Sequence, residues 1–402
     1  MRRGPKRVSN RVPIGEPYGG KLVDRLIGER KRERILKEAY SMVKIRPHLD
    51  AVYDMDKIGI GAYSPLEGFM CREDFDGVIT RSRLADDLPW TIPILMAPSH
   101  VTNPEAIDMV KEGDDVALVD FSDKPIAIMH VEEKFRFDKR KFATSVYGTL
   151  DMSHPNVSDI FDLGDVALGG KIDQIKRLDL PASRFELTPS ETRKAFKEKG
   201  WSTVAAYQCR NPPHTAHEYL QRCALELVDG LHIHPVVGRL KKGDYKPEII
   251  LKAYEAAVKK YYRSDRVLLS SLSITMRYGG PRAALFLAII RKNYGATHFI
   301  VGRDLAGAKS ASGKDFYDPY ECHRVFDEYD VGIVPLRYAE AFYCKACGWM
   351  ASSKTCPHET SQHLSTSQTR IREMLREGKR PPSEILRPEV AEVLMGDNLF
   401  VE

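Results

Sequence analysis

Residues 204–217, VAAYQCRNPPHTAH, decide how the central part of this chain folds. The apolar run at its start predicts a short buried strand over 204–208, and Pro212 and Pro213 end that strand, because proline cannot donate to a strand ladder. A helix is predicted to follow over 214–228. The free N–H groups and the positive dipole of its first turn point back into the loop between strand and helix.

Strands and helices alternate on both sides of this stretch. The capping box Thr188-Pro189-Ser190-Glu191 begins a helix that ends near Lys199. Downstream, strands are predicted over 231–237, 266–272 and 297–302, and helices over 246–262 and 281–293. The alternation predicts an α/β domain over residues 185–334, in which a doubly wound parallel sheet binds ligands at the carboxyl ends of its strands.

The regions that flank this domain have other patterns. Short strands separated by Gly, Pro and Asp are predicted over 91–96, 115–118, 125–131 and 166–169, after a helix near 28–43. No helical pattern alternates with these strands, so we predict a β-rich N-terminal domain over 1–184 without a parallel sheet. The segment 335–402 is cysteine-rich and then helical over 370–377, which predicts a small C-terminal lobe.

Composition places the chain among ordinary globular proteins. Of its 402 residues, 43% are hydrophobic and 29% are charged, which excludes a disordered, collagen-like or coiled-coil protein. The longest uncharged stretch, 88–104, contains four prolines and is too short to span a membrane. No signal-peptide pattern follows Met1, so we expect a cytoplasmic protein with no membrane partner.

The net charge of +5 is concentrated near the N-terminus. Residues 1–34 carry eleven basic and four acidic residues, so the rest of the chain has a net charge of −2. The basic arm contains Arg2, Arg3, Lys6, Arg7 and Arg11. Such an arm is consistent with nucleic-acid binding or with a solvated terminus. We favour the solvated terminus and do not expect a nucleic acid as a partner.

Polar side chains in the 208–217 stretch predict an anion site. His214 and His217 are three residues apart, so they share one face of the first helical turn. Arg210 adds a planar fork that suits a tetrahedral oxyanion. With the helix N-terminus, these groups can hold phosphate oxygens, whereas histidines that only cap the helix and pack are the structural alternative.

Two further predicted strand ends carry arginine beside glycine. They are residues 302–307, GRDLAG, and residues 276–282, MRYGGPR. Each of them alone is explained by an ordinary turn. Three arginine-bearing turns from neighbouring strands together predict a positively charged crevice that suits a nucleoside triphosphate and a second anion.

Seven cysteines without a secretion signal predict reduced thiols or a metal site instead of disulfides. Three of them form a C-x2-C-x8-C cluster: Cys344, Cys347 and Cys356. His358 and His363 are available as the fourth ligand of a zinc ion, and three reduced thiols are the alternative. We favour His363, because Pro357 stiffens the link from Cys356 to His358.

These motifs resemble those of the ATP sulfurylase (sulfate adenylyltransferase) family. Residues 208–217 resemble its QxRNPxHxxH motif, 302–307 its GRDHAG motif, 276–295 its MRYAGPREA…IIRKNYG segment, and 63–70 the signature of its N-terminal PUA-like domain. The resemblance covers roughly residues 45–400. It implies a PUA-like domain, a Rossmann-like nucleotidyltransferase domain and, as in bacterial and archaeal members, a C-terminal zinc site.

The resemblance also implies a reaction and its residues. Sulfate would attack the α-phosphorus of MgATP in line, giving adenosine 5′-phosphosulfate and pyrophosphate, in a homodimer or larger assembly with structural Zn²⁺. The implied catalytic residues are Arg210, Asn211, His214 and His217. The implied sulfate contacts are Gln208, Arg210 and the backbone at Ala306. The implied ATP contacts are Arg210, Asn211, Pro212, Pro213, His214, His217, Gly302, Arg303, Asp304, Leu305 and Ala339.

The chain departs from the family pattern at two positions. Cys209 stands where the family usually has threonine. Leu305 stands where it generally has histidine, and leucine cannot donate a hydrogen bond to a phosphate or ribose oxygen. Because the first motif is otherwise intact, we expect the activity to be retained.

Two alternative functions remain open at this level. Another adenylyltransferase would also place a His-x-x-His near the start of its first helix, but Arg210 and Arg303 favour a small inorganic oxyanion. A zinc-ribbon RNA-binding protein would use the PUA-like domain and the basic arm. It would bind RNA with a steep salt dependence and would catalyse no pyrophosphate exchange.

Overall fold

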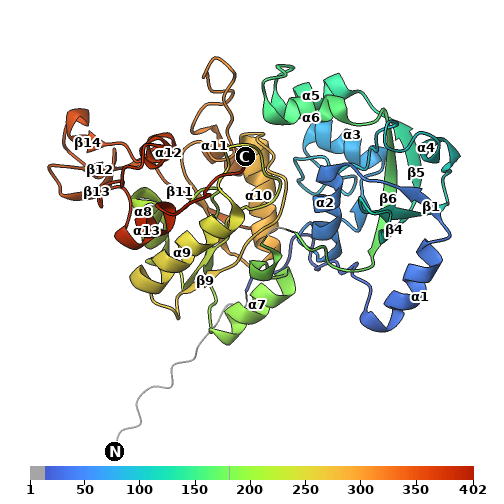
Figure 1. Cartoon of the computed structure of the whole chain (residues 1–402), viewed down its shortest axis with the longest axis horizontal. Helices are drawn as coiled ribbons and strands as arrows, with labels where there is room; N and C mark the ends of the chain where they lie inside the picture. The colour runs from blue at the N-terminus through green and yellow to red at the C-terminus, as the bar shows by residue number, and fades with distance from the viewer. Residues whose placement is uncertain (1–13, 181) are drawn as a thin grey trace, which may run out of the picture.

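A computed structural model describes residues 14–180 and 182–402 (Figure 1). The basic arm from Arg2 to Arg11 lies outside the described residues. The N-terminal half is built on a mixed sheet and the C-terminal half on a parallel sheet, with α10 (Pro281–Asn293) and α2 (Leu49–Gly59) on either side of the junction. Phe286 of α10 packs against Tyr63 and Trp90, so a single apolar core continues across the junction.

The N-terminal sheet confirms most of the predicted strands. Its order is β1 (Val43–Ile45), β3 (Asp115–Val119), β4 (Pro125–His130), β6 (Val166–Gln174) and β2 (Gly68–Phe69), with β5 (Glu133–Arg136) also on β6. All of these pairs are antiparallel except β1 with β3. The predicted first helix is α1 (Glu29–Ala39).

Two features of this half differ from the prediction. Residues 91–96 form no strand, and only Met96 makes an isolated bridge, to Leu168. Helices are also more numerous than predicted; they are α2, α3 (Arg72–Arg81), α4 (Ala106–Met109), α5 (Lys139–Tyr147) and α6 (Pro155–Asp162). The α2 helix buries charged side chains as well as apolar ones, so its sequence lacks the one-sided apolar pattern of a surface helix.

The central sheet is parallel throughout, as predicted. Its order is β11 (Val334–Arg337), β10 (His298–Val301), β7 (Val204–Tyr207), β8 (Gly230–Ile233) and β9 (Val267–Leu269). The predicted boundary after residue 334 falls inside β11, and the division into three domains stays a prediction. The connecting helices are α7 (Pro189–Glu198), α8 (Thr215–Leu225), α9 (Pro247–Tyr261), α10 and α11 (Glu321–Glu328).

The strand order fixes where a ligand can enter the central sheet. From β7 the chain proceeds to β8 and β9 on one side, and then returns to β10 and β11 on the other. The loops that leave β7 and β10 therefore diverge, and a crevice opens between the carboxyl ends of these two strands. The two most informative predicted motifs follow β7 and β10 directly.

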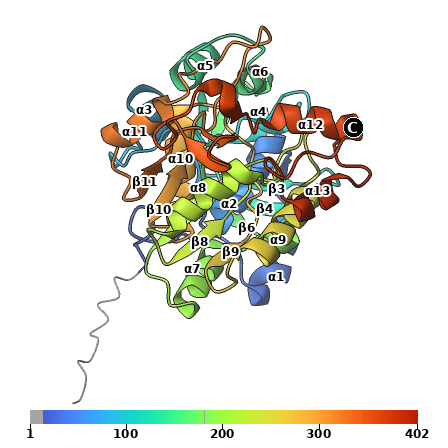
Figure 2. The same cartoon turned by 90° about the vertical axis from the view of Figure 1, so that its left-hand side faces the viewer.

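The C-terminal segment adds a small sheet and two helices. The sheet order is β13 (Trp349–Ser352), β12 (Ala341–Cys344) and β14 (His363–Leu364), followed by α12 (Gln368–Arg376) and α13 (Pro388–Leu394). Figure 2 shows α13 beside α9, and both contribute to one apolar core. Residues 399–401 then run along the β8–α9 loop, where Gly243 N donates to Val401 O at 2.9 Å and Val401 N to Asp244 O at 2.8 Å.

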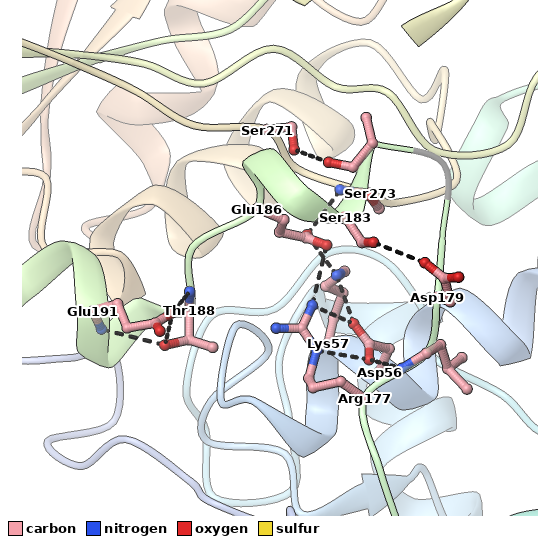
Figure 3. A network of polar contacts seen from close by, with 12 residues as sticks. Asp56, Lys57, Arg177, Asp179, Ser183, Glu186, Thr188, Glu191, Ser271 and Ser273 are labelled. Atoms are coloured by element: carbon pink, nitrogen blue, oxygen red, sulfur yellow. Dashed lines mark hydrogen bonds and ion pairs between the residues drawn. The ribbon is translucent and has the colours of Figure 1, made fainter. Parts of the chain in front are cut away.

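A buried ion network joins the two halves (Figure 3). Glu186, in the segment that leads to α7, accepts hydrogen bonds from Lys57 Nζ at 2.6 Å, Arg177 at 3.1 Å and the backbone N–H of Ser273 at 2.9 Å. Asp56 accepts from the same two cations. Burial alone would raise the pKa of Asp56, but Lys57 and Arg177 hold it well below its usual range. Each buried charge is thus compensated.

The capping box predicted at the start of α7 is present (Figure 3). Glu191 N donates to Thr188 Oγ1 at 3.2 Å, and Thr188 N donates to Glu191 Oε2 at 2.7 Å.

Across residues 14–180 and 182–402, no helix is both long and apolar enough to cross a membrane.

Candidate active site

A cavity of about 460 Å³ opens where β7 and β10 end. Its walls are the loops after these strands, the first turn of α8 and the chain on both sides of the β12–β14 sheet. Most of the predicted site residues line it: Gln208, Arg210, Asn211, His214, His217, Gly302, Arg303, Asp304, Leu305, Ala306 and Ala339. Pro212 and Pro213 are buried beside it and do not line it.

Arg210 is held in place before any ligand arrives. One amino group donates to Asp244 Oδ2 at 2.9 Å, and the other donates to the hydroxyl of Tyr278. The Arg210 side chain is 18% exposed and that of Asp244 is 14% exposed, so the pair is largely shielded from water. Tyr278 belongs to the 276–282 turn that was predicted to border the crevice, although no role was predicted for it, whereas Asp244 was not predicted to belong to the site.

His214 and His217 lie one above the other at the start of α8, where His214 is the N-cap residue. Their ring centroids are 3.6 Å apart and the ring planes are inclined by 21°. Burial, together with the neighbouring His217 ring, holds the pKa of His214 well below its usual value, so His214 is neutral at physiological pH. His214 can therefore act as a hydrogen-bonding group without adding charge.

Cys209 lies beside His217. Its Sγ is 3.7 Å from His217 Nε2 and accepts a hydrogen bond from the backbone N–H of Asn211 at 3.3 Å. Burial alone would raise the pKa of the thiol, but His217 and the Asn211 N–H lower it to about 7. Gln208 precedes it, and its buried Oε1 has no hydrogen-bond partner among the described residues.

The turn after β10 has an unusual backbone. Asp304 and Ala306 adopt left-handed conformations with φ of 57° and 60°, which non-glycine residues seldom do. A side chain at Gly307 would place its Cβ 1.8 Å from Asp304 Oδ1, so glycine leaves room for the carboxylate of Asp304 in its observed position. Strained turns of this kind persist where the surrounding structure fixes them, which is common at ligand sites.

The third predicted turn does not supply arginine to the cavity. Arg277 is buried between the two halves, where it donates to Asp50 Oδ2 at 3.2 Å and Asp54 Oδ2 at 2.7 Å. Arg282 donates to backbone carbonyls of the N-terminal half. The prediction of three arginine-bearing walls is therefore wrong for this turn, because carboxylates from α2 neutralise Arg277. Met276 and Tyr278 line the cavity instead.

The C-terminal segment supplies a wall of which only Ala339 was predicted. Arg372 of α12 donates to Asn211 Oδ1 at 2.9 Å, and Gln368 Nε2 donates to the carbonyl of Pro212 at 3.1 Å. The only local signal for this wall is Ser367, which caps α12 just after a strand. The signal marks the start of a helix and does not show that the helix packs on a loop 161 residues earlier.

A second polar cluster lies in the small C-terminal sheet. One ligand atom from each of Cys344, Cys347, Cys356 and His358 falls within 4.8 Å of the others. His358 Nδ1 is 3.5, 3.3 and 3.7 Å from the three sulfurs in that order. Tetrahedral zinc with Zn–S bonds near 2.3 Å needs ligand atoms about 3.8 Å apart, so three thiols and an imidazole at these spacings fit that ion.

His363, the favoured fourth ligand, sits at the edge of this cluster. Its Nε2 is 3.6 Å from Cys356 Sγ, and its ring stacks on Phe342 with centroids 3.7 Å apart. Of the three cysteines, Cys356 lies within contact distance of His363, whereas all three lie within contact distance of His358. This geometry favours His358, and the ligand set stays a prediction.

Comparison with known proteins decides the family. The ATP-sulfurylase family matches residues 183–396, which is more than half of the chain, and the PUA-like domain family matches residues 15–177.

The chain belongs to the ATP-sulfurylase family.

Sulfate adenylyltransferases are similar to this ATP-sulfurylase chain over nearly its full length. The protein of that name from Pyrococcus abyssi is 47% identical over 97% of this chain and 100% of its own length. The one from Halothermothrix orenii is 48% identical over 94% and 98%, respectively. These matches confirm the resemblance and the predicted fold class.

A solved structure shows the same fold at a larger distance. The hexameric APS kinase from Thiobacillus denitrificans superimposes with a TM-score of 0.74 and 24% sequence identity. The match covers 94% of this ATP-sulfurylase chain and 67% of that one.

Proposed function

We propose that this chain is a sulfate adenylyltransferase that converts MgATP and sulfate to adenosine 5′-phosphosulfate and pyrophosphate. The observation that carries the proposal is the cavity in which Arg210, the His214–His217 pair and the turn 302–307 meet. The similarity to sulfate adenylyltransferases at 47–48% identity supports the same reaction.

The charge of the substrates defines what the site must do. Sulfate is a dianion and needs no base to become a nucleophile, but it must approach a triphosphate of the same sign. In this proposal Arg210 and Gln208, with the backbone at Ala306, hold sulfate in line with the α-phosphorus. Placing two reactants in one geometry removes much of the entropic barrier of a bimolecular step.

The remaining residues would bind ATP. The N-terminus of α8, His217 and Asn211 would hold phosphate oxygens while negative charge moves onto pyrophosphate, and Mg²⁺ bound to ATP would supply further neutralisation. Neutral His214 would donate or accept a hydrogen bond there. Gly302, Arg303, Asp304, Leu305 and Ala339 would form the remaining ATP wall, while Pro212 and Pro213 would shape the loop from beneath.

We also propose that the C-terminal cluster holds one structural Zn²⁺. Cys344, Cys347, Cys356 and His358 would supply a closed set of four ligands, with no open position for a substrate. The cluster lies on the sheet from which residues 339–341 and 365–368 run to the cavity wall. Zinc would therefore support this wall without taking part in the chemistry.

We also propose how the chain divides into domains, how it assembles and where it is located. The family resemblance supports domains over 1–184, 185–334 and 335–402, a homodimer and a cytoplasmic location. The APS kinase with the same fold is described as hexameric, so light scattering on the purified protein tests the dimer. A mass of two chains is expected.

Sulfate-dependent exchange of labelled pyrophosphate into ATP tests the function directly. The protein with MgATP, pyrophosphate and sulfate should exchange label, and omission of sulfate should abolish the exchange. Exchange that requires another acceptor would favour a different adenylyltransferase. Salt-sensitive RNA binding without any exchange would favour the RNA-binding alternative.

A further inference from the structure

Arg372 connects two loops of the cavity from a helix that lies far along the chain. Its Nη2 donates to Asn211 Oδ1 at 2.9 Å, and its Nη1 donates to the carbonyl of Gly243 at 3.1 Å. The guanidinium also lies over the ring of Tyr245, 4.7 Å from the centroid. Two hydrogen bonds and a cation–π contact leave this side chain one orientation.

The hydrogen bond to Asn211 has a chemical consequence. Arginine can only donate, so it must take the oxygen of the Asn211 amide. Asn211 lines the cavity, and its NH₂ group is then the part of the amide that can donate to an anion there. Without Arg372, the amide is free to turn its oxygen toward the negatively charged substrates.

A second contact joins the same two loops. Each of its two residues is next in sequence to a residue that Arg372 binds. Arg210 precedes Asn211, and its partner Asp244 follows Gly243. The fork of Arg372 and the Arg210–Asp244 ion pair thus cross-link the β7–α8 loop to the β8–α9 loop. Of these two cross-links, the Arg372 fork comes from the C-terminal helix α12.

We propose that Arg372 is a positioning residue of this site, which orients Asn211 as a donor toward the reacting phosphate. The proposal rests on the proposed function, and Arg372 itself touches no reacting atom. It assigns to α12 a role in the rate of the reaction in addition to its role in the cavity wall.

A double-mutant cycle with Asn211→Ala and Arg372→Ala tests the proposal in the pyrophosphate exchange assay. If Arg372 acts through Asn211, each single variant should lose about 10²-fold in kcat, the typical effect of a misplaced group. The double variant should be no worse than Asn211→Ala alone. Losses that multiply, or an Arg372→Ala variant with wild-type kcat, would overturn the proposal.

Arg376→Ala is the matched control. Arg376 lies one turn further along α12, where its guanidinium is 5.4 Å from the Phe400 ring centroid and outside the cavity. Its kcat should equal that of the wild type, and calorimetry should show each variant folded at the assay temperature. A wild-type protein without exchange would refute the function itself, whereas an exchanging wild type with multiplying losses refutes only the role of Arg372.

Asn211→Asp gives a second, independent readout. Arg372 would pair with one carboxylate oxygen, so the melting temperature should match or exceed that of the wild type. The other oxygen would replace the NH₂ donor and repel the substrates, so kcat should fall at least as far as in Asn211→Ala. Asn211→Asp with near wild-type kcat would contradict the donor role.

Discussion

Arg210 and Asp244 form an ion pair of 2.9 Å between two loops of the cavity, and Tyr278 accepts a hydrogen bond from the other amino group of Arg210. The planar guanidinium is thus fixed on two sides before substrates bind. The arrangement is typical of preorganised sites, in which the donors are in place before charge develops on the substrate.

Arg210→Ala should lower kcat/KM for sulfate by about 10²-fold or more, as does the loss of one preorganised oxyanion donor. Arg210→Lys should recover little, because an ammonium cannot contact Asp244 and a tetrahedral oxyanion with the geometry of the fork. Initial rates of exchange against sulfate concentration measure both variants. Near wild-type rates in Arg210→Ala would refute the assignment of Arg210.

Leu305→His should change the KM for ATP by about tenfold at most, which corresponds to about 1.4 kcal/mol. Leu305 packs partly against the main core and also lines the cavity, so a histidine there can gain one contact to ATP. Leu305→Met, which keeps the volume, is the control and should leave KM unchanged. A gain of several orders of magnitude in kcat/KM would mean that the wild-type site is adapted to another substrate.

His358→Ala should lose stoichiometric zinc and His363→Ala should keep it, as measured by elemental analysis of purified protein. His358 is near all three sulfurs, whereas His363 is near one. Because binding energy at such a site is folding energy, His358→Ala should also melt at a lower temperature. Its kcat, measured well below that temperature, should stay within a few-fold. The reverse pattern of zinc content would assign His363.

Iodoacetamide should inactivate the protein by alkylating Cys209, at a rate that rises with pH through about 7. The pKa of this thiol is lowered to about 7, and the thiolate that forms above this pH is the reactive species. ATP should protect, because Cys209 lines the cavity. Cys209→Ser should resist inactivation, and peptide mapping identifies the labelled residue. Equal inactivation of Cys209→Ser would exclude this thiol.

Lys57→Met should destabilise the protein by about 3–5 kcal/mol in urea unfolding, because two buried carboxylates would lose a shared partner. Lys57, Asp56 and Glu186 have fully buried side chains. Lys260→Met is the control, since the Lys260 side chain is 64% exposed and its ion pair with Glu389 is long, at 4.0 Å. Its effect should stay below about 1 kcal/mol. Equal effects of the two substitutions would contradict the role of the network.

The parts of the fold that the sequence predicts correctly depend on local signals. The capping box at Thr188 marks the start of α7, and α10 begins at Pro281 as predicted. Pro212 and Pro213 separate β7 from α8. The anion site follows from the same signals, because parallel strands bring the ends of β7 and β10 together once their order is known.

The features that were missed depend on contacts distant in sequence. Arg277 has the appearance of an anion ligand until Asp50 and Asp54, more than 220 residues earlier, neutralise it. Arg372 has no distinguishing neighbour in sequence, yet it meets Asn211 in the folded chain. Residues 91–96 are mostly apolar but make only one bridge, since a strand requires a partner that sequence alone does not show.

The contact of residues 399–401 with the β8–α9 loop sets an order of events during synthesis. That loop carries Asp244 and Gly243, and its backbone hydrogen bonds reach Val401. A ribosome-bound chain that ends before residue 401 contains every strand of the central sheet but lacks the two hydrogen bonds between Val401 and this loop. These two hydrogen bonds therefore form only after translation has passed residue 401, although residues 208–217 are made nearly two hundred codons earlier.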